Sequence, residues 1–376
     1  MRMAVPTEAP GERRVAMTPQ VALRLVEQRH RLTIQRGAGW AAGFADDDYR
    51  AEGVDLSDDP LQNTEAVLVV GPPRAELAGR IPVGSLLIGF LDPFSSHELI
   101  KVLVDRRITS IAMEAIPRTT VAQSMDALSS QSTAAGYQAV LLAADASPRM
   151  FPMLTTAAGT IPPARVLVLG AGVAGLQAIA TARRLGAVVS AYDIRPEVQE
   201  QIESLGARFV AAPVDESAAA ASGYAREVAD ETLRRQMDAL APHIARSEVV
   251  ITTAQVPGIA APLLVSREMV EQMRPGSVIV DAAAPTGGNV ELTRPGETVV
   301  HNGVTILGPL DLSGRVANDA SQMYARNLAA LITRLTAESG DLLLDFDDAI
   351  LADACVTHDG AVIHPVVRRS LGMEGS

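Results

Sequence analysis

The sequence predicts an α/β protein made of two domains, each a doubly wound parallel sheet with helices on both faces. Three observations support this prediction. Short, wholly apolar runs recur along the chain between helix-like segments, as in parallel sheets that are buried on both sides. One strand–turn–helix–strand unit, between residues 166 and 193, carries glycines at GxGxxG spacing. The length of 376 residues is sufficient for two domains with separate cores.

The N-terminal third of the chain alternates strand and helix candidates. Met3–Pro6 is strand-like, and Thr18 followed by Pro19 is typical of a helix start, with Thr18 as the capping residue. Gly37 to Gly39 is interpreted as a turn between a strand and a helix. Further buried strands are expected at 32–34, 65–70, 85–90 and 108–113, and a helix at 97–105. This order predicts a parallel first domain.

A long helix-like segment follows at about 121–146, where Gly136 is the only glycine and no proline occurs. It is long enough to link two domains. An amphipathic helix candidate at 321–335 would return the chain to the first domain. We therefore expect a discontinuous first domain, residues 1–128 plus 319–376, and a second domain over residues 129–318, with a cleft between them.

The centre of the second domain is the unit with the glycines. Val166–Leu169 is wholly apolar, which is typical of a strand buried on both faces. Gly170, Gly172 and Gly175 follow it. In this spacing the first glycine permits a sharp turn, the second lets backbone approach a pyrophosphate, and the third lets the helix pack against the strand. A strand at 188–192 then leads to Asp193. The arrangement is typical of a Rossmann-like dinucleotide-binding domain.

Asp193 indicates which dinucleotide is bound. Its carboxylate can accept hydrogen bonds from the hydroxyls of an adenosine ribose and would repel a 2′-phosphate, so NAD(H) is favoured over NADP(H). A Gly-rich structural turn with a capping Asp is the first alternative, and the full motif context argues against it. A membrane span is the second, because residues 166–182 carry no charge. Its glycines and short length argue against that interpretation.

The rest of the second domain is less marked. Strands are expected at 208–211, 249–253, 277–281 and 304–307. Between Pro213 and about Gly223, the low apolar content predicts a mobile surface loop.

Two groups of residues are expected in the crevice at the carboxyl ends of the strands. Arg118, Gln123, Asp126 and Ser129 follow the strand at 108–113, and Arg118 can hold a carboxamide or a phosphate while Asp126 pairs with it. A solvated helix start explains these four residues equally well. In the second domain, small residues would admit a flat nicotinamide and its ribose at two strand ends, Thr252–Ala254 and Asp281–Ala283.

Composition argues against several functions. The net charge of −12 disfavours nucleic acid or an acidic membrane surface as a direct partner. With Lys101 the only lysine, Cys355 the only cysteine and no metal spacing among six histidines, we expect no Schiff-base catalysis, disulfide or metal. The N-terminus carries no recognisable signal sequence, which predicts a cytoplasmic protein. The lack of an acid–base constellation is compatible with direct hydride transfer between two nicotinamides.

Several stretches resemble a known family. Glu12–Pro19, Ala42–Tyr49 and the glycine motif are similar to the alanine dehydrogenase/proton-pumping transhydrogenase superfamily. The stretches that resemble its transhydrogenase branch are Pro117–Ser132, Ala157–Ala164, Gly223–Ala225 and Leu344–Asp348. The resemblance covers essentially the whole chain. It fits the NAD(H)-binding component, in the form that carries no transmembrane helices of its own.

This resemblance implies hydride exchange between NADH on this chain and NADP(H) on an NADP(H)-binding partner domain. Membrane-spanning transhydrogenase subunits would couple the exchange to proton translocation. The resemblance also implies a homodimer, attached peripherally through those subunits to the inner face of the cytoplasmic membrane.

The resemblance further implies roles for individual residues. Arg118, Asp126 and Ser129 would orient the nicotinamide ring, and Gln123 would reach toward the partner's nucleotide. Tyr224 would lie on a mobile loop that closes over the bound nucleotide. Together, the motif and the resemblance assign cofactor binding to Gly170, Gly172, Val173, Ala174, Gly175, Asp193, Ile194, Arg195, Gly223, Tyr224, Thr253 and Ala254.

The chain also departs from the family. Alanine dehydrogenases use a lysine and a histidine for pyruvate where this chain has Val69 and Phe90, so a 2-oxo acid would lack its charge partner and its proton donor. Ile259 replaces the lysine of a Pro-Gly-Lys-Pro pattern, and Pro285 stands where Glu or Gln is commoner. Two alternatives therefore stay open: a stand-alone NAD-dependent amino- or hydroxy-acid dehydrogenase, and a non-catalytic NAD(H)-binding subunit.

Overall fold

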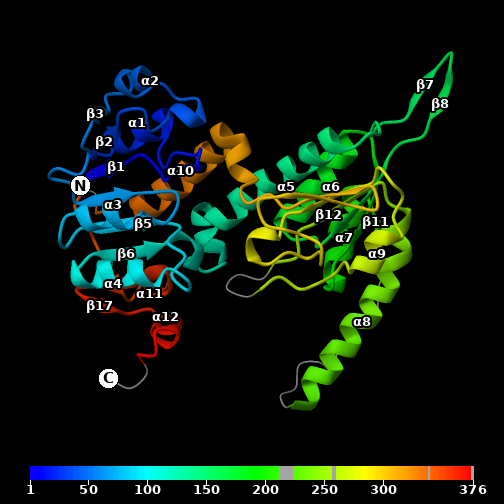
Figure 1. Cartoon of the computed structure of the whole chain (residues 1–376). Coiled ribbons are helices and arrows are strands. Elements are labelled where there is room, and N and C mark those ends of the chain that lie inside the picture. The colour runs from blue at the N-terminus through cyan, green and yellow to red at the C-terminus, as the bar shows by residue number, and fades with distance from the viewer. Residues whose placement is uncertain (212–222, 256–259, 338, 374–376) are drawn as a thin grey trace. The chain divides into compact units, whose positions relative to one another are not determined.

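The computed structural model describes residues 1–211, 223–255, 260–337 and 339–373, and of residues 223–233 it describes the backbone alone. The chain forms two compact units (Figure 1). The first comprises Met1–Gln131 and Ser313–Ser376, and the second comprises Ser132–Leu312.

The first unit contains a sheet in the order β17-β16-β6-β5-β4-β1-β2-β3. The six strands from β1 to β6 are mutually parallel, as expected from the alternation of strands and helices. An antiparallel pair near the C-terminus, β16 and β17, extends the sheet next to β6, which the sequence analysis missed. The strands are β1 (Arg2–Val5), β2 (Arg31–Gln35), β3 (Asp55–Ser57), β4 (Ala66–Leu68), β5 (Leu86–Gly89), β6 (Thr109–Ala112), β16 (Cys355–His358) and β17 (Ala361–Val362).

Both faces of this sheet are covered, so the unit is doubly wound. Neighbouring residues of β4 enter two different apolar clusters, Leu68 in one and Val67 in the other. The first cluster includes residues of α1 (Pro19–Glu27), α2 (Asp46–Ala51), α10 (Ala317–Arg334) and α11 (Ala349–Ala354). The second includes residues of α3 (Ala75–Arg80), α4 (His97–Asp105) and α12 (Pro365–Ser370).

Helix α1 begins at the predicted residue but without the predicted cap. Thr18 precedes it with an extended backbone, yet its side chain makes no capping hydrogen bond. The hydroxyl is buried and has no partner among the described residues. Pro19 at the first helical position fixes the backbone for a helix by itself, so this helix starts without a side-chain cap.

The second unit contains a sheet in the order β11-β10-β9-β12-β13-β15-β14. Its strands are parallel except β14, an antiparallel edge strand that the sequence analysis missed. The order reverses between β9 and β12, and such a switch point is where α/β sheets bind dinucleotides. The strands are β9 (Arg165–Leu169), β10 (Val188–Tyr192), β11 (Arg208–Phe209), β12 (Val249–Thr252), β13 (Val278–Asp281), β14 (Thr298–His301) and β15 (Val304–Leu307).

Helices lie on both faces of this sheet as well. One apolar cluster joins Val166 and Val168 to residues of α5 (Ala127–Ala146), α6 (Val173–Arg184) and α7 (Gln199–Ser204). The other joins Leu167 and Leu169 to residues of α8 (Gly223–Arg246) and α9 (Arg267–Glu271). Adjacent residues of β9 thus face opposite layers, which explains why this strand is apolar throughout.

The predicted long helix at 121–146 is wrong at its start. Residues Thr120–Met125 form the 3₁₀ helix η3, and α5 begins only at Ala127. Asp126 explains the break, because its carboxylate accepts hydrogen bonds from the backbone N–H of Ser129 at 2.9 Å and from its hydroxyl at 2.6 Å. These contacts satisfy donors that a helix start leaves free.

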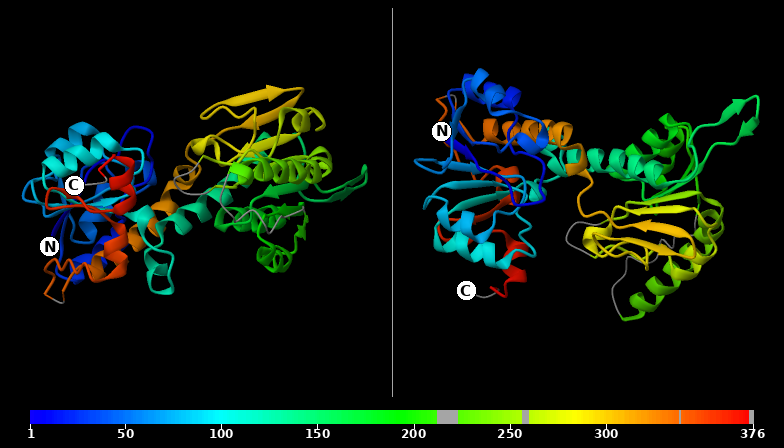
Figure 2. Two further views of the ribbon diagram at one scale, coloured as in Figure 1. Left: turned by 90° about the horizontal axis from the view of Figure 1, so that it is seen from below. Right: turned by 45° about the horizontal axis from the view of Figure 1, so that its top comes forward.

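A hairpin of β7 (Leu154–Thr156) and β8 (Gly159–Ile161) also escaped sequence analysis. All six of its strand residues are exposed, so no hydrophobic pattern identifies it. Both views of Figure 2 show it extending away from the sheet of its own unit. The surface loop predicted from Pro213 to about Gly223 lies almost wholly outside the described residues, and Gly223 is the first residue of α8. None of the helices in the described parts of the chain is both long and apolar enough to cross a membrane.

Candidate functional site

The glycine motif forms a tight turn between β9 and α6. Gly170 has a φ of +95°, which favours glycine strongly. A Cβ on Gly175 would lie 1.9 Å from the Gly170 carbonyl oxygen, so α6 packs directly on the turn. Nothing lies within 4 Å of a Cβ built on Gly172, where backbone faces open space. Each glycine therefore meets the requirement that its predicted role imposes.

Helix α6 begins at Val173, immediately after Gly172. The first backbone N–H groups of a helix have no partner within it, so those of Val173, Ala174 and Gly175 are suited to an anionic group. This end of α6 also packs against α5, because a Cβ on Gly136 would lie 2.1 Å from the carbonyl oxygen of Ala174. The start of α6 is therefore fixed by close backbone contacts on two sides.

Asp193 lies at the carboxyl end of β10 and already holds this turn. Its Oδ2 accepts a hydrogen bond from the Ala171 N–H at 2.7 Å, and its Oδ1 accepts one from the Arg195 N–H at 2.9 Å. The Arg195 guanidinium adds two contacts, and only 6% of the Asp193 side chain is exposed. Burial acts to raise the pKa of Asp193, but the hydrogen bonds from Arg195 and Ala171 outweigh it and lower the pKa. The carboxylate is thus ionised, and the Arg195 guanidinium donates to both of its oxygens. The side chain of Ile194, next to Asp193 in the sequence, is exposed.

The segment after β12 closes the other side of the turn. The Thr253 hydroxyl donates to the Gly170 carbonyl at 3.0 Å, and the Ala254 N–H donates to Oδ1 of Asn289 at 3.1 Å. Asp281, expected to line the crevice, is instead fully buried and bonds inward. Asn289 is a residue that sequence reasoning missed, since it lies far along the chain from the strand end that it supports.

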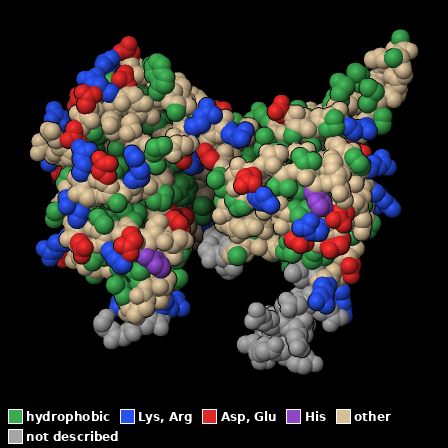
Figure 3. Space-filling model, in the orientation of Figure 1, with side chains coloured by type: hydrophobic (Ala, Val, Ile, Leu, Met, Phe, Trp, Pro, Cys, Tyr) green, Lys and Arg blue, Asp and Glu red, His purple; other side chains and the backbone are tan. Residues whose placement is uncertain are grey.

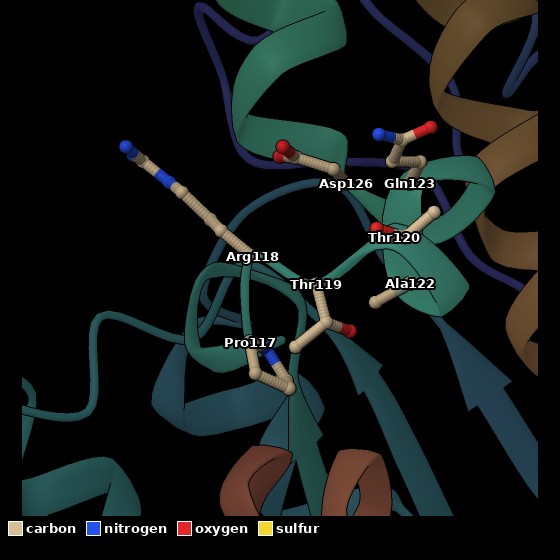
Figure 4. A pocket seen from close by; sticks show the side chains of 7 residues that line it. All are labelled: Pro117, Arg118, Thr119, Thr120, Ala122, Gln123 and Asp126. Carbon is tan, nitrogen blue, oxygen red and sulfur yellow. The ribbon is translucent and has the colours of Figure 1, made fainter.

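Arg118, Gln123 and Asp126 line a hollow of about 230 Å³ in the first unit, together with Pro117, Thr119, Thr120 and Ala122. Figure 4 shows their side chains projecting from one loop and the 3₁₀ turn, with Arg118 extended. Ala122 and Met125 are buried and anchor the turn, and Asn327 of α10 donates to the Ser124 carbonyl at 2.8 Å.

The expected pairing of Asp126 with Arg118 is not found among the described contacts. Asp126 accepts hydrogen bonds from Ser129 instead, which places Ser129 as the partner that fixes its carboxylate. Arg118 and Gln123 are exposed on the same loop. The loop thus offers an exposed guanidinium, an exposed amide and a fixed carboxylate around one hollow.

Gly223 and Tyr224 were expected on a mobile loop, but their backbone forms the first turn of α8. The side chain of Tyr224 lies outside the described residues, so its predicted role stays a prediction.

Val69 and Phe90, which stand where alanine dehydrogenases have a lysine and a histidine, are apolar residues packed near Tyr324. Val69 is only 1% exposed, and its carbonyl accepts a hydrogen bond of 2.8 Å from the Tyr324 hydroxyl. Phe90 packs on the ring of Tyr324 with centroids 5.2 Å apart. Neither of those two side chains carries a charge or a proton donor that a small polar substrate could use.

Two partly buried carboxyl groups near these residues, those of Glu8 and Glu114, were also missed. Glu8 accepts hydrogen bonds from the Val70 N–H at 2.7 Å and the Gly71 N–H at 3.3 Å. Glu114 accepts from Leu91 and Asp92. Burial raises the pKa of Glu8 to about 8 and that of Glu114 to about 7. Glu8 holds the loop after β4, and Glu114 holds the loop after β5. No local sequence pattern predicts these contacts.

The strand order, the glycine turn and the ionised Asp193 together define a Rossmann-like protein of the dinucleotide-binding class. Comparison with family models identifies the family. "Alanine dehydrogenase/PNT, N-terminal domain" matches residues 4–135, and "Alanine dehydrogenase/PNT, C-terminal domain" matches residues 139–365. The chain belongs to the alanine dehydrogenase/PNT family.

Individual relatives divide between the two named activities. An NAD(P) transhydrogenase alpha-subunit polypeptide of Rhodospirillum rubrum is 42% identical over 98% of this chain and 99% of its own length. The crystal structure of transhydrogenase from Sinorhizobium meliloti has a TM-score of 0.89 and 40% identity, covering 96% of this chain and all of that one. An alanine dehydrogenase of Halomonas elongata is 32% identical over 100% of this chain and 98% of its own length. Of these, the two transhydrogenases are the more similar.

Proposed function

We propose that this chain is the NAD(H)-binding component of a proton-translocating NAD(P) transhydrogenase. NADH bound here would supply a hydride to NADP⁺ on a partner domain, and membrane subunits would couple the transfer to proton movement. The observation that carries the proposal is the glycine turn at the switch point of the sheet, closed by an ionised Asp193. The higher identity to transhydrogenase subunits supports the choice of reaction.

In this proposal the second unit binds the adenosine and pyrophosphate portions of the nucleotide. Gly172 lets backbone approach the pyrophosphate, and the N–H groups at the start of α6 donate to it. Asp193 accepts hydrogen bonds from the ribose hydroxyls, which requires Arg195 to share or release some of its contact. Ile194 is exposed beside this acid and offers an apolar surface to the adenine.

The loop around the 230 Å³ hollow of the first unit would contact the nicotinamide end. Arg118 and Asp126 would orient the ring, with Ser129 holding the Asp126 carboxylate in place. Gln123 is exposed and would reach toward the nucleotide on the partner. Direct transfer needs ring apposition and no general acid or base, so these residues would act by positioning.

The packing around Val69 and Phe90 argues against the alanine dehydrogenase alternative. Reduction of a 2-oxo acid needs a cationic partner for the carboxylate and a proton donor for the carbonyl oxygen. Val69 is buried and Phe90 is stacked on Tyr324, so neither position supplies such a group. No observation in the described residues favours that alternative over the transhydrogenase.

We further propose a homodimer held by the β7–β8 hairpin, attached to the inner membrane face through its partner subunits. Met153, Leu154 and Ile161 are 64%, 37% and 43% exposed on or next to this hairpin. Figure 3 shows hydrophobic side chains gathered along it at the upper right. Apolar side chains on an extended, uncovered hairpin are typical of a surface that a second protein covers.

The deciding experiment measures hydride transfer from NADPH to an NAD⁺ analogue by the purified chain, with and without an NADP(H)-binding domain from a related enzyme. We expect turnover only with the partner domain, and direct binding of NADH in equilibrium dialysis. The Gln123→Ala variant should lose most of the transfer while retaining NADH binding. NADH binding without transfer would favour a non-catalytic subunit, and NAD reduction by an amino or hydroxy acid would favour a dehydrogenase. Absence of NADH binding would overturn the nucleotide site itself.

A further inference from the structure

A buried polar network supports the strand ends beside the glycine turn. Its centre is Asp281 at the end of β13, whose carboxylate accepts five hydrogen bonds. Oδ1 accepts from the Thr252 hydroxyl at 2.8 Å and the Ala283 N–H at 3.1 Å. Oδ2 accepts from the N–H groups of Asn289 at 2.9 Å and Val290 at 3.2 Å, and from the Thr293 hydroxyl at 2.7 Å.

Asn289 carries this network to the neighbouring strand end. Its side chain is fully buried and meets both polar groups of the Ala254 backbone: Oδ1 accepts from the N–H at 3.1 Å and Nδ2 donates to the carbonyl at 2.9 Å. Nδ2 also donates to the Pro262 carbonyl at 2.8 Å. With the bond that its own N–H donates to Asp281, Asn289 makes four hydrogen bonds of this network, and they hold its side chain in one orientation. The position of the Ala254 backbone is therefore closely defined.

The Ala254 segment in turn contacts the glycine turn. A Cβ on Gly170 would lie 2.9 Å from the Ala254 nitrogen, and the Thr253 hydroxyl donates to the Gly170 carbonyl. Thr253 and Ala254 are themselves only partly buried, so they present surface at the carboxyl ends of the strands. A chain of contacts thus runs from a fully buried carboxylate to the edge where a nucleotide would bind.

We propose that Asp281 and Asn289 are positioning residues that fix Thr253 and Ala254 for the nicotinamide half of the bound dinucleotide. The inference rests on the proposed function. Adenosine is expected beside Asp193 at the end of β10, and the pyrophosphate at the turn after β9. The other half of a dinucleotide then lies across the switch point, over the ends of β12 and β13.

The residue types at these positions follow from their partners. Asp281 faces only donors, so both of its side-chain oxygens must accept, and an asparagine would turn an NH₂ group toward a backbone N–H. Asn289 faces one donor and two carbonyl acceptors through its side chain, which an aspartate cannot match. Gly288 allows this approach, since a Cβ there would lie 2.6 Å from Oδ2 of Asp281.

The test compares NADH with ADP, which contains the adenosine and pyrophosphate but lacks the nicotinamide end. Equilibrium dialysis would be performed on the wild type, Asp281→Asn and Asn289→Ala. Ser277→Ala is the matched control, because its buried hydroxyl donates at the opposite end of β13. Thr293→Val, which removes one of the five donors to Asp281, serves as a milder variant that folds if Asp281→Asn does not.

We expect Asp281→Asn and Asn289→Ala to weaken NADH binding about tenfold while ADP binding changes less than about twofold. Thr293→Val should weaken NADH binding about threefold, and Ser277→Ala should change neither ligand. Unchanged NADH affinity in all three network variants would overturn the positioning role, as would a parallel loss of NADH and ADP. A wild type that binds neither ligand would overturn the proposed function instead.

Discussion

The guanidinium of Arg195 lies against the carboxylate of Asp193, with Nε 2.9 Å from Oδ1 and Nη2 3.1 Å from Oδ2. The two side chains differ in exposure, since 52% of the arginine and 6% of the aspartate are accessible. Asp193, which is proposed to select NAD(H), therefore also holds the Arg195 guanidinium at the carboxyl end of β10. In the proposed site, nucleotide choice would therefore depend on this pair and not on the aspartate alone.

We predict that Asp193→Asn weakens NADH binding about tenfold, or about 1.4 kcal/mol, because the neutral amide accepts fewer and weaker hydrogen bonds. The same change frees Arg195 to meet a 2′-phosphate, so NADPH binding should improve. Equilibrium dialysis with both nucleotides measures this. Glu200→Gln, which removes a charge at an exposed residue of α7, should alter neither. Stronger binding of NADH by Asp193→Asn would contradict the proposed role.

A second prediction separates two glycines of the turn. Gly175→Ala places a methyl group 1.9 Å from the Gly170 carbonyl oxygen, so it should destabilise the protein by about 3 kcal/mol and abolish NADH binding. Gly172→Ala meets no protein atom within 4 Å, and stability should change by less than about 1 kcal/mol. Its methyl group would occupy the approach of the pyrophosphate, so NADH binding should still be lost. Thermal unfolding and dialysis together test the pair, and normal NADH affinity in Gly172→Ala would refute the assignment.

The two partly buried acids of the first unit, Glu8 and Glu114, predict how stability depends on pH. Their folded pKa values, about 8 for Glu8 and about 7 for Glu114, lie above the ordinary value of 4.5. Between pH 4.5 and these values the unfolded chain loses protons that the folded protein keeps, so the free energy of unfolding falls as pH rises. The decrease from these groups levels off above about pH 9, and is on the order of several kcal/mol.

Glu114→Gln should flatten this decrease in urea unfolding between pH 5 and 8, because the amide does not titrate. Glu76→Gln, at an exposed residue of α3, is the control and should leave the slope unchanged. A slope that is identical in Glu114→Gln and in the wild type would show that Glu114 ionises normally in the folded protein.

The hairpin predicts an effect on assembly. Leu154→Asp and Ile161→Asp should convert a dimer to monomers in sedimentation experiments, because a charge would have to be buried in the contact. Both side chains are exposed, so the unfolding temperature of the monomeric variants should fall little. Val300→Asp makes the same kind of change at an exposed residue of β14, the edge strand of the same unit, and should leave the assembly intact. A wild type that sediments as a monomer would remove the basis of the proposed dimer.

The central strands and the glycine turn could be predicted because their signals are local. A wholly apolar run such as Val166–Leu169 contributes to both faces of a sheet, and the spacing of Gly170 and Gly175 reflects a contact within one turn. Strands at the edges lack such a signal: β14 alternates exposed and partly buried residues, and the β7–β8 hairpin is exposed throughout.

The features of the site that escaped prediction depend on contacts between distant residues. Asn289 supports Ala254 from 35 positions away, and Glu8 holds the loop after β4 from 62 positions away. A single sequence shows neither pairing. The start of α5 was missed for a different reason. The predicted helix ran from residue 121 through Asp126 and Ser129, so their hydrogen bond was not recognised as a cap at a helix start.

The packing around Val69 also constrains how this sequence can change over evolutionary time. The Val69 side chain lies against the backbone of Gly89, where a Cβ would be only 2.5 Å away. The Tyr324 hydroxyl donates a hydrogen bond to the Val69 carbonyl, and Phe90 packs on the ring of the same tyrosine. A charged side chain at position 69 would be buried there without an opposite charge among the contacts described for Val69. A descendant of this chain would therefore need at least two substitutions to acquire 2-oxo acid chemistry, because positions 69 and 90 both lack the groups that it requires, and the first of these changes would have to be tolerated by the buried packing before it brought any benefit.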